Sequence, residues 1–325
     1  MPGPPHRARP ESLHPRNRHR GGLDFPRLIA RRPGLAKFVF VNQWGGESLD
    51  FADPAAQRAL AEALLAEHYG VGWWDLPPGY LCPSIPGRAD YVHTAADLLA
   101  SCNDNWIPRG ERVCALDVGT GANCVYPLIG HAEYGWRFVG SDIDRGALAA
   151  AGRIVEATPR LRGVIEPRLQ PSPSSILEGL LRPGERFDVS LCNPPFHASA
   201  REAEEGSRRK WKNLGRGGAP GRQPALNFGG RGAELWCPGG ERVFVRRLIA
   251  ESAKLHHRCL WFTSLVAKRE SLPAIRTALQ QARVVESRTL ELKQGQKTSR
   301  IVAWTFFAPA EREAWRAERW QQPGR

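Results

Sequence analysis

The chain of 325 residues contains no long apolar run. No stretch approaches the ~20 consecutive apolar residues that a membrane-spanning helix requires, so we expect a soluble protein. The first 20 residues are basic and lack the apolar core of a secretory signal. Four of the first ten residues are proline, which disfavours the amphipathic helix of a mitochondrial presequence. These absences predict a cytoplasmic protein.

Cysteine pairs of the kind that bind zinc are also lacking. The seven cysteines are scattered along the chain, none forms a Cys-x-x-Cys motif, and no Cys/His pair has zinc spacing. We therefore expect free thiols in a reducing compartment and no metal, although a zinc site assembled from distant residues stays open. The sequence has no internal repeat and no coiled-coil pattern, so we expect a monomer.

Acidic residues are scarce in two segments. Residues 1–37 carry nine Lys/Arg against two acids, and residues 207–232 carry seven Lys/Arg and no acid. Together the two segments account for more than the whole net charge of +13, so the rest of the chain is nearly neutral. Two local basic segments on a neutral body indicate a polyanionic partner that binds at particular places.

Helix and strand patterns change near residue 110. Before it, Asp53-Pro54 predicts the start of a helix over 55–68, a Pro/Gly-rich passage covers 76–87, and a second helical run covers 90–101. After it, strand-like apolar runs alternate with helix-like stretches. The predicted strands are 113–118, 136–143, 163–170, 187–192, 258–265, 284–292 and 300–307, and the predicted helices are 123–130, 145–156, 174–181, 241–257 and 272–283.

This alternation predicts an α/β fold, with helices on both faces of a mainly parallel sheet. The last two strands leave no room for a crossover helix and should form an antiparallel hairpin. Seven strands with a terminal hairpin are typical of Rossmann-like methyltransferases that use S-adenosylmethionine. We expect three parts: a basic, mainly helical N-terminal extension over 1–110, whose first 24 residues are extended or weakly ordered; a methyltransferase domain over 111–310 with a basic Gly-rich loop at 200–235; and a C-terminal tail over 311–325.

A glycine turn follows the first strand of the predicted domain, in the run Leu-Asp-Val-Gly-Thr-Gly-Ala-Asn over 116–123. Asp117, Gly119 and Gly121 of this run are candidate cofactor-binding residues, because glycines let a ligand approach the backbone. A dinucleotide fingerprint requires a third glycine where this chain has Cys124, which disfavours a pyrophosphate site. S-adenosylmethionine has no phosphate, and Asp142 at the end of the second strand suits its ribose hydroxyls. The alternative role of Asp142 is the N-cap of the next helix.

The tetrapeptide Asn193-Pro194-Pro195-Phe196 follows the strand at 187–192. The two prolines end the strand, and the proline after Asn193 keeps that residue extended. A polar amide and an aromatic ring are thus placed at the carboxyl end of a strand, where ligands bind in open α/β sheets. By itself the tetrapeptide is equally consistent with an ordinary strand end.

The same four residues suit methylation of an amino group on a base. The nitrogen lone pair of such an amine is delocalised into the ring. Fixed hydrogen-bond acceptors for the two amine N–H groups are therefore needed to orient this lone pair toward the methyl group. The side-chain oxygen of Asn193 and the Pro194 carbonyl are the expected acceptors. Phe196 is expected to stack on an unstacked base.

Several longer motifs carry a resemblance to a known family. The motifs are Leu13–His19, Pro86–His93, Gly121–Gly130, Asn193–His197, Asn227–Gly230, Glu234–Cys237 and Trp261–Val266. Over about 13–316 the chain resembles the bacterial 23S rRNA adenine-N6 methyltransferases that modify adenine 1618. The resemblance implies S-adenosylmethionine as the donor and N6-methyladenine as the product. The chain departs from many members at 215–224, where their loops are often shorter.

A related eukaryotic group of RNA adenine-N6 methyltransferases shares the core motifs. By that resemblance Arg88, Asn123, Asp142 and Ser174 are further cofactor contacts, Ser174 on the weakest match.

Cations beside the predicted site are candidate RNA contacts. Arg208, Arg209, Lys210 and Lys212 flank Trp211 shortly after Phe196, which suits phosphate contacts with base stacking. Arg16 and Arg18 would supply a second set. Three alternatives stay open: a guanine-N2 rRNA enzyme, a protein-glutamine methyltransferase, and a non-catalytic RNA-binding module.

Overall fold

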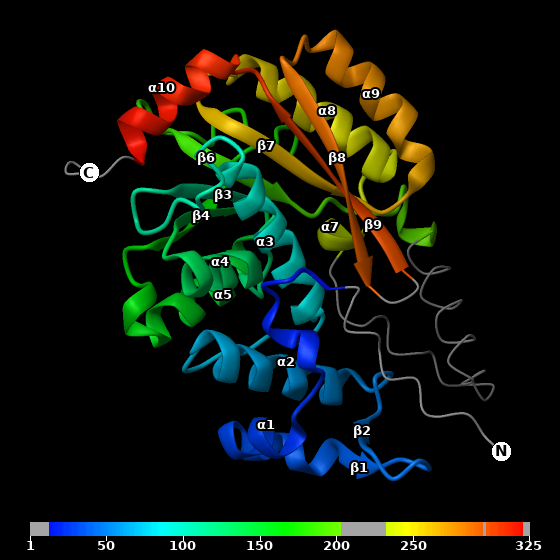
Figure 1. Cartoon of the computed structure of the whole chain (residues 1–325). Coiled ribbons are helices and arrows are strands. Elements are labelled where there is room, and N and C mark those ends of the chain that lie inside the picture. Colours follow the sequence, from blue (N-terminus) through cyan, green and yellow to red (C-terminus); the bar gives the residue numbers. More distant parts are fainter. Residues whose placement is uncertain (1–12, 203–231, 295–296, 321–325) are drawn as a thin grey trace, which may run out of the picture.

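The computed structural model describes residues 13–202, 232–294 and 297–320 (Figure 1). Its centre is a seven-stranded sheet in the order β5-β4-β3-β6-β7-β9-β8. The first five strands of this order are parallel, and β9 runs antiparallel to both of its neighbours. The predicted sheet with its terminal hairpin is therefore confirmed. The strands are β3 (Cys114–Val118), β4 (Arg137–Asp142), β5 (Ile165–Leu169), β6 (Phe187–Cys192), β7 (Cys259–Val266), β8 (Glu286–Gln294) and β9 (Lys297–Thr305).

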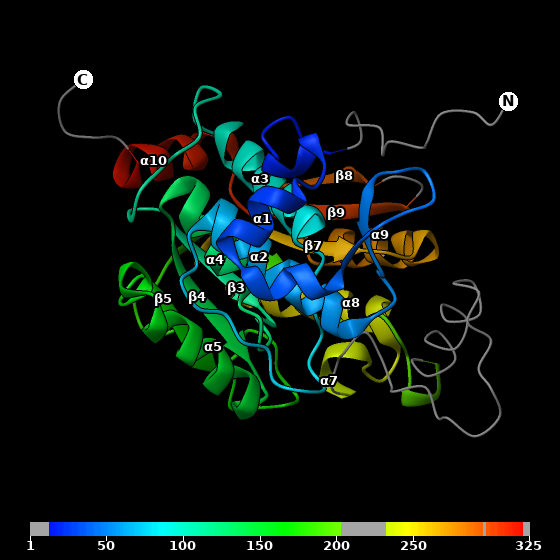
Figure 2. The same cartoon turned by 90° about the horizontal axis from the view of Figure 1, so that it is seen from below.

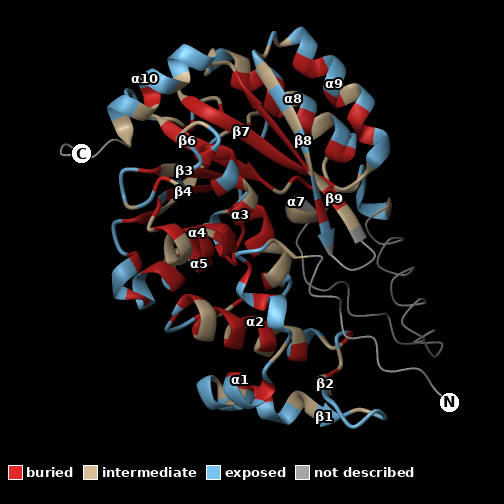
Figure 3. Cartoon of the chain, in the orientation of Figure 1, coloured by how far each residue is buried: buried red, intermediate tan, exposed pale blue. Residues whose placement is uncertain are grey.

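Helices cover both faces of the sheet. On one face lie α3 (Ile85–Ala100), α4 (Val125–Tyr134) and α5 (Arg145–Ala157), whose apolar side chains form one hydrophobic cluster with that face. On the other face α8 (Gly240–Lys254) and α9 (Leu272–Gln281) form a second cluster. Figure 3 shows the result, with buried strands between helices whose outer sides are exposed. The carboxyl ends of the parallel strands are thus left open between the two helical layers.

The N-terminal part extends the first helical layer. It contains α1 (Phe25–Arg31), a small hairpin of β1 (Val39–Val41) and β2 (Glu47–Leu49), and α2 (Pro54–Tyr69). Figure 2 looks onto α1 and α2, which lie over α4. Leucines of α1 and α2 belong to the same hydrophobic cluster as α4 and α5, so the extension shares one core with the sheet.

Residues 13–24 are not extended or weakly ordered as predicted. They include a 3-10 turn over Arg18–Gly21, and Asn17 and His19 are buried. The Asn17 amide donates to Asp90 Oδ1 at 2.5 Å and to the Pro86 carbonyl at 2.9 Å. These long-range contacts fix the segment on α3, and sequence periodicity carries no signal for them. Residues 1–12 lie outside the described part of the chain.

Three predicted boundaries change in the structure. Helix α3 begins at Ile85, earlier than the predicted start at residue 90. Pro86 is tolerated in the first helical turn because backbone N–H groups have no helical acceptor there. Arg88 therefore lies on this helix. The stretch 174–181 is not helical. There the Glu251 carboxylate accepts the backbone N–H groups of Ile176 and Leu177 at 2.8 and 2.7 Å, in place of helical carbonyls.

The third change concerns the C-terminal tail predicted over 311–325. Residues Pro309–Arg319 form the helix α10, and the side chain of Trp315 is buried. The last residues, 321–325, lie outside the described ranges.

Among the described residues, no helix is long and apolar enough to cross a membrane. The same part of the chain contains no group of three or more His, Cys, Asp or Glu side chains that could hold a metal ion. All seven cysteines have free thiols.

Candidate active site

A pocket of about 430 Å³ lies at the carboxyl ends of β3, β4 and β6. This volume falls within the range of roughly 300–1,000 Å³ that is usual for small-molecule sites. Seven of the eleven predicted catalytic and cofactor-binding residues line it: Arg88, Gly119, Gly121, Asn123, Asp142, Asn193 and Pro195. Sequence positions more than 100 residues apart are therefore brought into one cavity.

The glycine turn forms the floor of the pocket after β3. Gly119 and Gly121 have φ values of +77° and +64°, which L side chains rarely adopt. A Cβ atom on Gly121 would also lie 3.3 Å from the Asn123 amide nitrogen. Cys124, where a dinucleotide site would have glycine, also has a positive φ of 54° and precedes α4. The turn therefore leaves its backbone accessible to a ligand.

Asp142 ends β4 and closes one side of the pocket. Its Oδ2 accepts the Gly121 N–H and its Oδ1 accepts the Asp144 N–H, both at 2.9 Å. The N-cap of α5 is Asp144, whose carboxylate accepts the Gly146 N–H at 2.7 Å, so the capping role considered for Asp142 is wrong. Burial raises the pKa of Asp142 against the effect of its backbone hydrogen bonds.

Asp117 lies behind the glycine turn and does not line the pocket. Its side chain is fully buried, and neither carboxylate oxygen has a hydrogen-bond partner among the described residues. Burial raises its pKa to about 7, the nearby Asp142 adds to this effect, and the hydroxyl of Thr120 and the Arg88 guanidinium oppose it. The Thr120 hydroxyl lies beside this carboxyl group but outside good hydrogen-bond geometry. A fully buried carboxyl group is expensive to ionise without a strong partner, and such groups are common at functional sites.

Asn193 stands at the end of β6, at the mouth of the pocket. Its Oδ1 is buried and has no hydrogen-bond partner among the described residues. Tyr91 on α3 holds the preceding residue, because its hydroxyl accepts the Cys192 N–H at 3.1 Å. Pro195 lines the pocket, whereas Phe196 is partly buried against the hydrophobic cluster and Pro194 is buried. Asn193 thus lines the cavity and carries a buried amide oxygen that has no partner among the described residues.

The segment after Asn193–Phe196 is joined to a second part of the chain. His197 forms a bridge with Trp236: its N–H donates to the Leu235 carbonyl at 3.0 Å, and its carbonyl accepts the Cys237 N–H at 3.1 Å. Trp236 and Cys237 line the pocket beside Asn193. The motif Glu234–Cys237 carries part of the family resemblance, but no role at the site was predicted for it. Gln170 and Arg247 also line the pocket and were not predicted from the sequence.

Of two predicted cofactor contacts, Arg88 lies at the pocket as expected and Ser174 does not. Arg88 lines the pocket, and its Nη1 donates to the Tyr126 hydroxyl at 2.9 Å. Ser174 does not line the pocket: its hydroxyl bonds Ser172 at 2.8 Å and its carbonyl accepts Arg247 Nη2 at 2.7 Å. The neighbouring Pro173, Ser175 and Ile176 take the place that was expected for Ser174.

The N-terminal arginines predicted to contact RNA have partners within the chain. Arg16 Nη2 donates to Asp97 Oδ1 at 2.7 Å, and Arg18 Nε donates to Glu133 Oε1 at 2.6 Å. Both guanidinium groups therefore fix the N-terminal segment, and their predicted contact with RNA stays a prediction. Arg208, Arg209, Lys210 and Lys212 lie outside the described residues.

Known proteins resemble this chain along nearly its whole length. Residues 7–308 match the model of a family described as RNA methyltransferase. A "Ribosomal RNA large subunit methyltransferase F" of Pseudomonas fluorescens is 58% identical over 309 residues, which cover 95% of this chain and 91% of that protein. A protein of the same name from Ectopseudomonas mendocina is 53% identical over 99% of this chain and 100% of its own length.

Solved structures agree with this assignment. The human METTL16 catalytic domain in complex with an RNA hairpin of the MAT2A 3′UTR superposes with a TM-score of 0.75 at 32% identity, covering 91% of this chain and 98% of that one. The N-terminal domain of human METTL16 in complex with SAH gives a TM-score of 0.71 at 28% identity, covering 91% and 99%. The glycine turn, Asp142, Asn193 and Pro195 meet in one pocket of a matching fold. With the family model matched over residues 7–308, this chain therefore belongs to the RNA methyltransferase family.

Proposed function

We propose that this protein transfers a methyl group from S-adenosylmethionine to N6 of an adenine in the 23S rRNA of the bacterial large subunit, and that this adenine is position 1618, as in the family it resembles. A substrate of this kind places the enzyme in the cytoplasm. The observation that carries the proposal is the free, buried Oδ1 of Asn193 beside a pocket built on Gly119, Gly121 and Asp142. The names of the relatives support ribosomal RNA as the substrate.

The pocket residues fit S-adenosylmethionine. A carboxylate offers about four acceptor positions, and the two backbone N–H groups on Asp142 leave room for a pair of ribose hydroxyls. Apolar side chains of Leu81, Ile143 and Ile176 line the cavity and suit a flat adenine ring. Asp117 and Arg88 stand near the turn on which the amino-acid end would lie. When bound, the cofactor supplies a methyl group that is already activated by its sulfonium.

Asn193 then acts on the amine that accepts the methyl group. Its Oδ1 accepts one hydrogen of the exocyclic amine, which draws the nitrogen lone pair out of conjugation with the ring. The carbonyl of Pro194 is the proposed second acceptor. Because both groups are fixed by the strand end and by the prolines, they need no reorganisation as positive charge grows on the nitrogen.

Aromatic side chains position the base. Phe196 and Trp236 stand on the two segments that the His197 bridge joins, and Trp236 lines the pocket mouth. An adenine must leave its stack to reach this corner, and aromatic contacts of about 1–3 kcal/mol per base offset part of that cost.

A methylation assay tests the proposal. The full chain is incubated with labelled S-adenosylmethionine and with total rRNA from a strain that lacks the enzyme, and the labelled nucleoside and its position are identified. N6-methyladenosine at a single site of 23S rRNA is the expected product. N2-methylguanosine would instead favour the guanine enzyme, and the absence of any label would favour a non-catalytic RNA-binding module.

A further inference from the structure

The helical layer of α8 and α9 carries arginines that nothing in the described structure neutralises. Residues 239–285 contain nine Lys/Arg against three acids. Two of the acids, Glu241 and Glu251, are buried and accept backbone N–H groups of other segments, and Glu251 also lies 3.8 Å from Arg247. Neither carboxylate forms an ion pair with an exposed arginine of this layer among the described residues. Five exposed arginines form no ion pair or hydrogen bond with described residues, and we call them the arginine face: Arg242, Arg246, Arg269, Arg276 and Arg283.

This surface begins at the proposed reaction corner. Both α8 and α9 start at the carboxyl edge of the sheet, where Asn193 stands (Figure 1). The first residue of α8 packs on the segment after Phe196, since a Cβ atom on Gly240 would lie 3.1 Å from the Ala198 nitrogen. Arg242 is therefore in the first turn next to the corner, and Arg246 follows one turn later on the same side of the helix.

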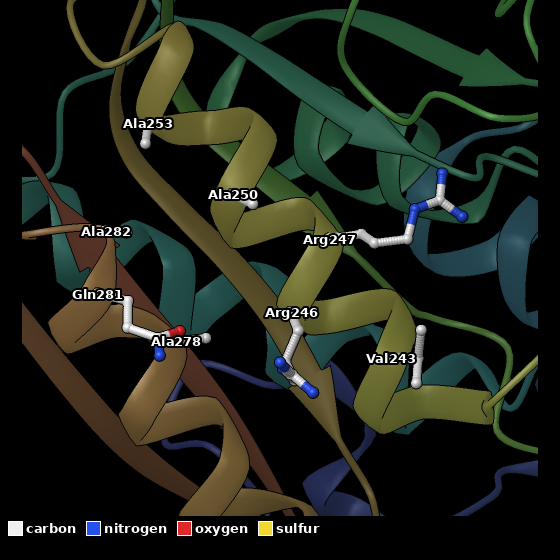
Figure 4. A pocket seen from close by; sticks show the side chains of 8 residues that line it. All are labelled: Val243, Arg246, Arg247, Ala250, Ala253, Ala278, Gln281 and Ala282. Atoms are coloured by element: carbon white, nitrogen blue, oxygen red, sulfur yellow. The ribbon is translucent and has the colours of Figure 1, made fainter.

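A groove separates the two helices along this surface. It has a volume of about 540 Å³, and its lining comes mainly from alanines: Ala250, Ala253, Ala278 and Ala282. Figure 4 shows Arg246 on α8 and Gln281 on α9 on the two sides of the groove, whereas the Arg247 side chain points away from α9. Small side chains keep the groove open, and a free guanidinium and an amide stand at its sides.

We propose that the groove and the arginine face, led by Arg242 and Arg246, bind the sugar-phosphate backbone of the RNA strand next to the target base. Guanidinium groups form paired hydrogen bonds with phosphate, and the alanine floor gives the sugars an uncharged surface. Exposed cations that have no partner among the described residues, on a layer that starts at the proposed reaction corner, fit a polyanion better than an apolar protein segment. The inference rests on the proposed function, because the RNA is its substrate.

The test compares two double variants of the full chain. Arg242→Gln/Arg246→Gln removes two charges from the groove side. Arg145→Gln/Arg153→Gln removes two charges from α5 on the opposite face of the sheet, where neither arginine has a partner among the described residues. Binding of a 23S rRNA fragment is measured against salt concentration, and methylation is measured against RNA concentration.

The groove variant should reduce the slope of log affinity against log salt by roughly 0.7–0.9 per lost phosphate contact, and the α5 variant should leave it unchanged. The KM for RNA should rise while kcat at saturating RNA stays near that of the unchanged protein. Equal slopes for the two variants would overturn the proposal. The proposal would also be overturned if the groove variant bound assembled ribosomal particles more weakly but bound naked RNA normally. The arginine face would then contact a ribosomal protein instead of RNA.

Ala250→Glu is a third variant, which places a carboxylate in the exposed floor of the groove. It should weaken RNA binding through charge repulsion, and a melting temperature equal to that of the unchanged protein shows that the fold is intact. If the unchanged protein methylates no rRNA, the proposed function fails. If it methylates rRNA and the groove variants behave like the α5 variant, only this inference fails.

Discussion

At the scale of single residues, the proposed chemistry depends on polar atoms without partners. Most buried polar groups in proteins are hydrogen-bonded, since an unpaired one costs about 1–3 kcal/mol. Asn193 Oδ1 and both carboxylate oxygens of Asp117 depart from this rule among the described residues. Asn193 lines the pocket built on the glycine turn, whereas Asp117 is fully buried behind that turn. A ligand in the pocket that donates a hydrogen bond to Asn193 Oδ1 would offset the cost of burying this oxygen.

Asn193→Ala should lower the methylation rate about 10²–10³-fold, because a fixed acceptor for the developing charge is lost. The affinity for S-adenosylmethionine should change little, since Asp142 and the glycine turn stay in place. Single-turnover methylation of rRNA and calorimetric titration of the cofactor measure the two effects. A variant that no longer binds the cofactor would show that Asn193 has another role.

Asp117 makes the stability of the ligand-free protein depend on pH. Its folded pKa of about 7 lies above the ordinary value near 3.9, so the folded state keeps a proton that the unfolded chain loses between roughly pH 4 and 7. The free energy of unfolding therefore falls as pH rises through this range. Asp117→Asn should remove this fall and stabilise the ligand-free protein at pH 8 by about 1–3 kcal/mol.

Denaturant unfolding of Asp117→Asn and of the unchanged protein at pH 5 and pH 8 measures this effect. The same substitution should weaken cofactor binding if the carboxylate serves the cofactor. A gain in stability with unchanged cofactor affinity would remove Asp117 from the proposed binding residues.

At the scale of elements, one buried carboxylate attaches α10 to the sheet. Asp188 on β6 accepts the Trp315 Nε1–H at 2.8 Å and the Arg319 Nε–H at 2.9 Å through Oδ1. Its Oδ2 accepts the Cys114 N–H of β3 at 2.7 Å. Helix α10 thus closes the amino ends of the two central strands, opposite the pocket.

Asp188→Ala should destabilise the protein by about 3–5 kcal/mol, because it leaves the partly buried Arg319 and the indole N–H groups of Trp315 and Trp320 without an acceptor. Glu318→Ala on the same helix removes only an exposed ion pair with Arg186 and is the matched control, with little expected effect. Thermal and denaturant unfolding compare the two variants. Similar losses for both would mean that α10 is held by its apolar contacts instead.

At the scale of the whole molecule, a group of histidines holds the N-terminal segment on the first helical layer. His14 Nε2 contacts Asp97 Oδ2 at 2.7 Å, and His93 Nδ1 contacts the Tyr134 hydroxyl at 2.6 Å. Burial lowers the pKa values of His19 and His93 to about 3. Each has a second ring nitrogen that is buried without a partner among the described residues, so the folded state favours the neutral rings.

Acid should therefore loosen this part of the molecule. Because the folded pKa values lie below the ordinary 6.5, the unfolded chain binds more protons between roughly pH 3 and 6.5, and stability falls as pH falls through that range. The expected loss is about 2 kcal/mol per histidine between pH 7 and pH 5. Hydrogen exchange of residues 13–24 at the two pH values measures it.

His93→Gln should show a weaker pH dependence than the unchanged protein, whereas His256→Gln at an exposed site should not differ from it. Equal protection of residues 13–24 at pH 7 and pH 5 would contradict this account.

The sequence by itself determined the parts of the protein that depend on local pattern. Strand and helix periodicity gave the sheet and its terminal hairpin, because each element repeats its apolar residues at its own period. The glycine turn, Asp142 and the Asn193–Phe196 corner were identifiable because each follows directly from a strand end. The family resemblance added adenine and 23S rRNA, which the corner alone does not specify.

Only the tertiary structure decided which groups are partnered. It placed Arg16 and Arg18 against acids of the first helical layer, replaced Ser174 by its neighbours at the pocket, and brought Trp236 beside Asn193. It also left Arg242, Arg246 and Arg276 of α8 and α9 without partners among the described residues, whereas Arg247 of α8 is paired. Such pairings join residues far apart in the chain, and their energies depend on distance and burial, which periodicity and local motifs do not encode.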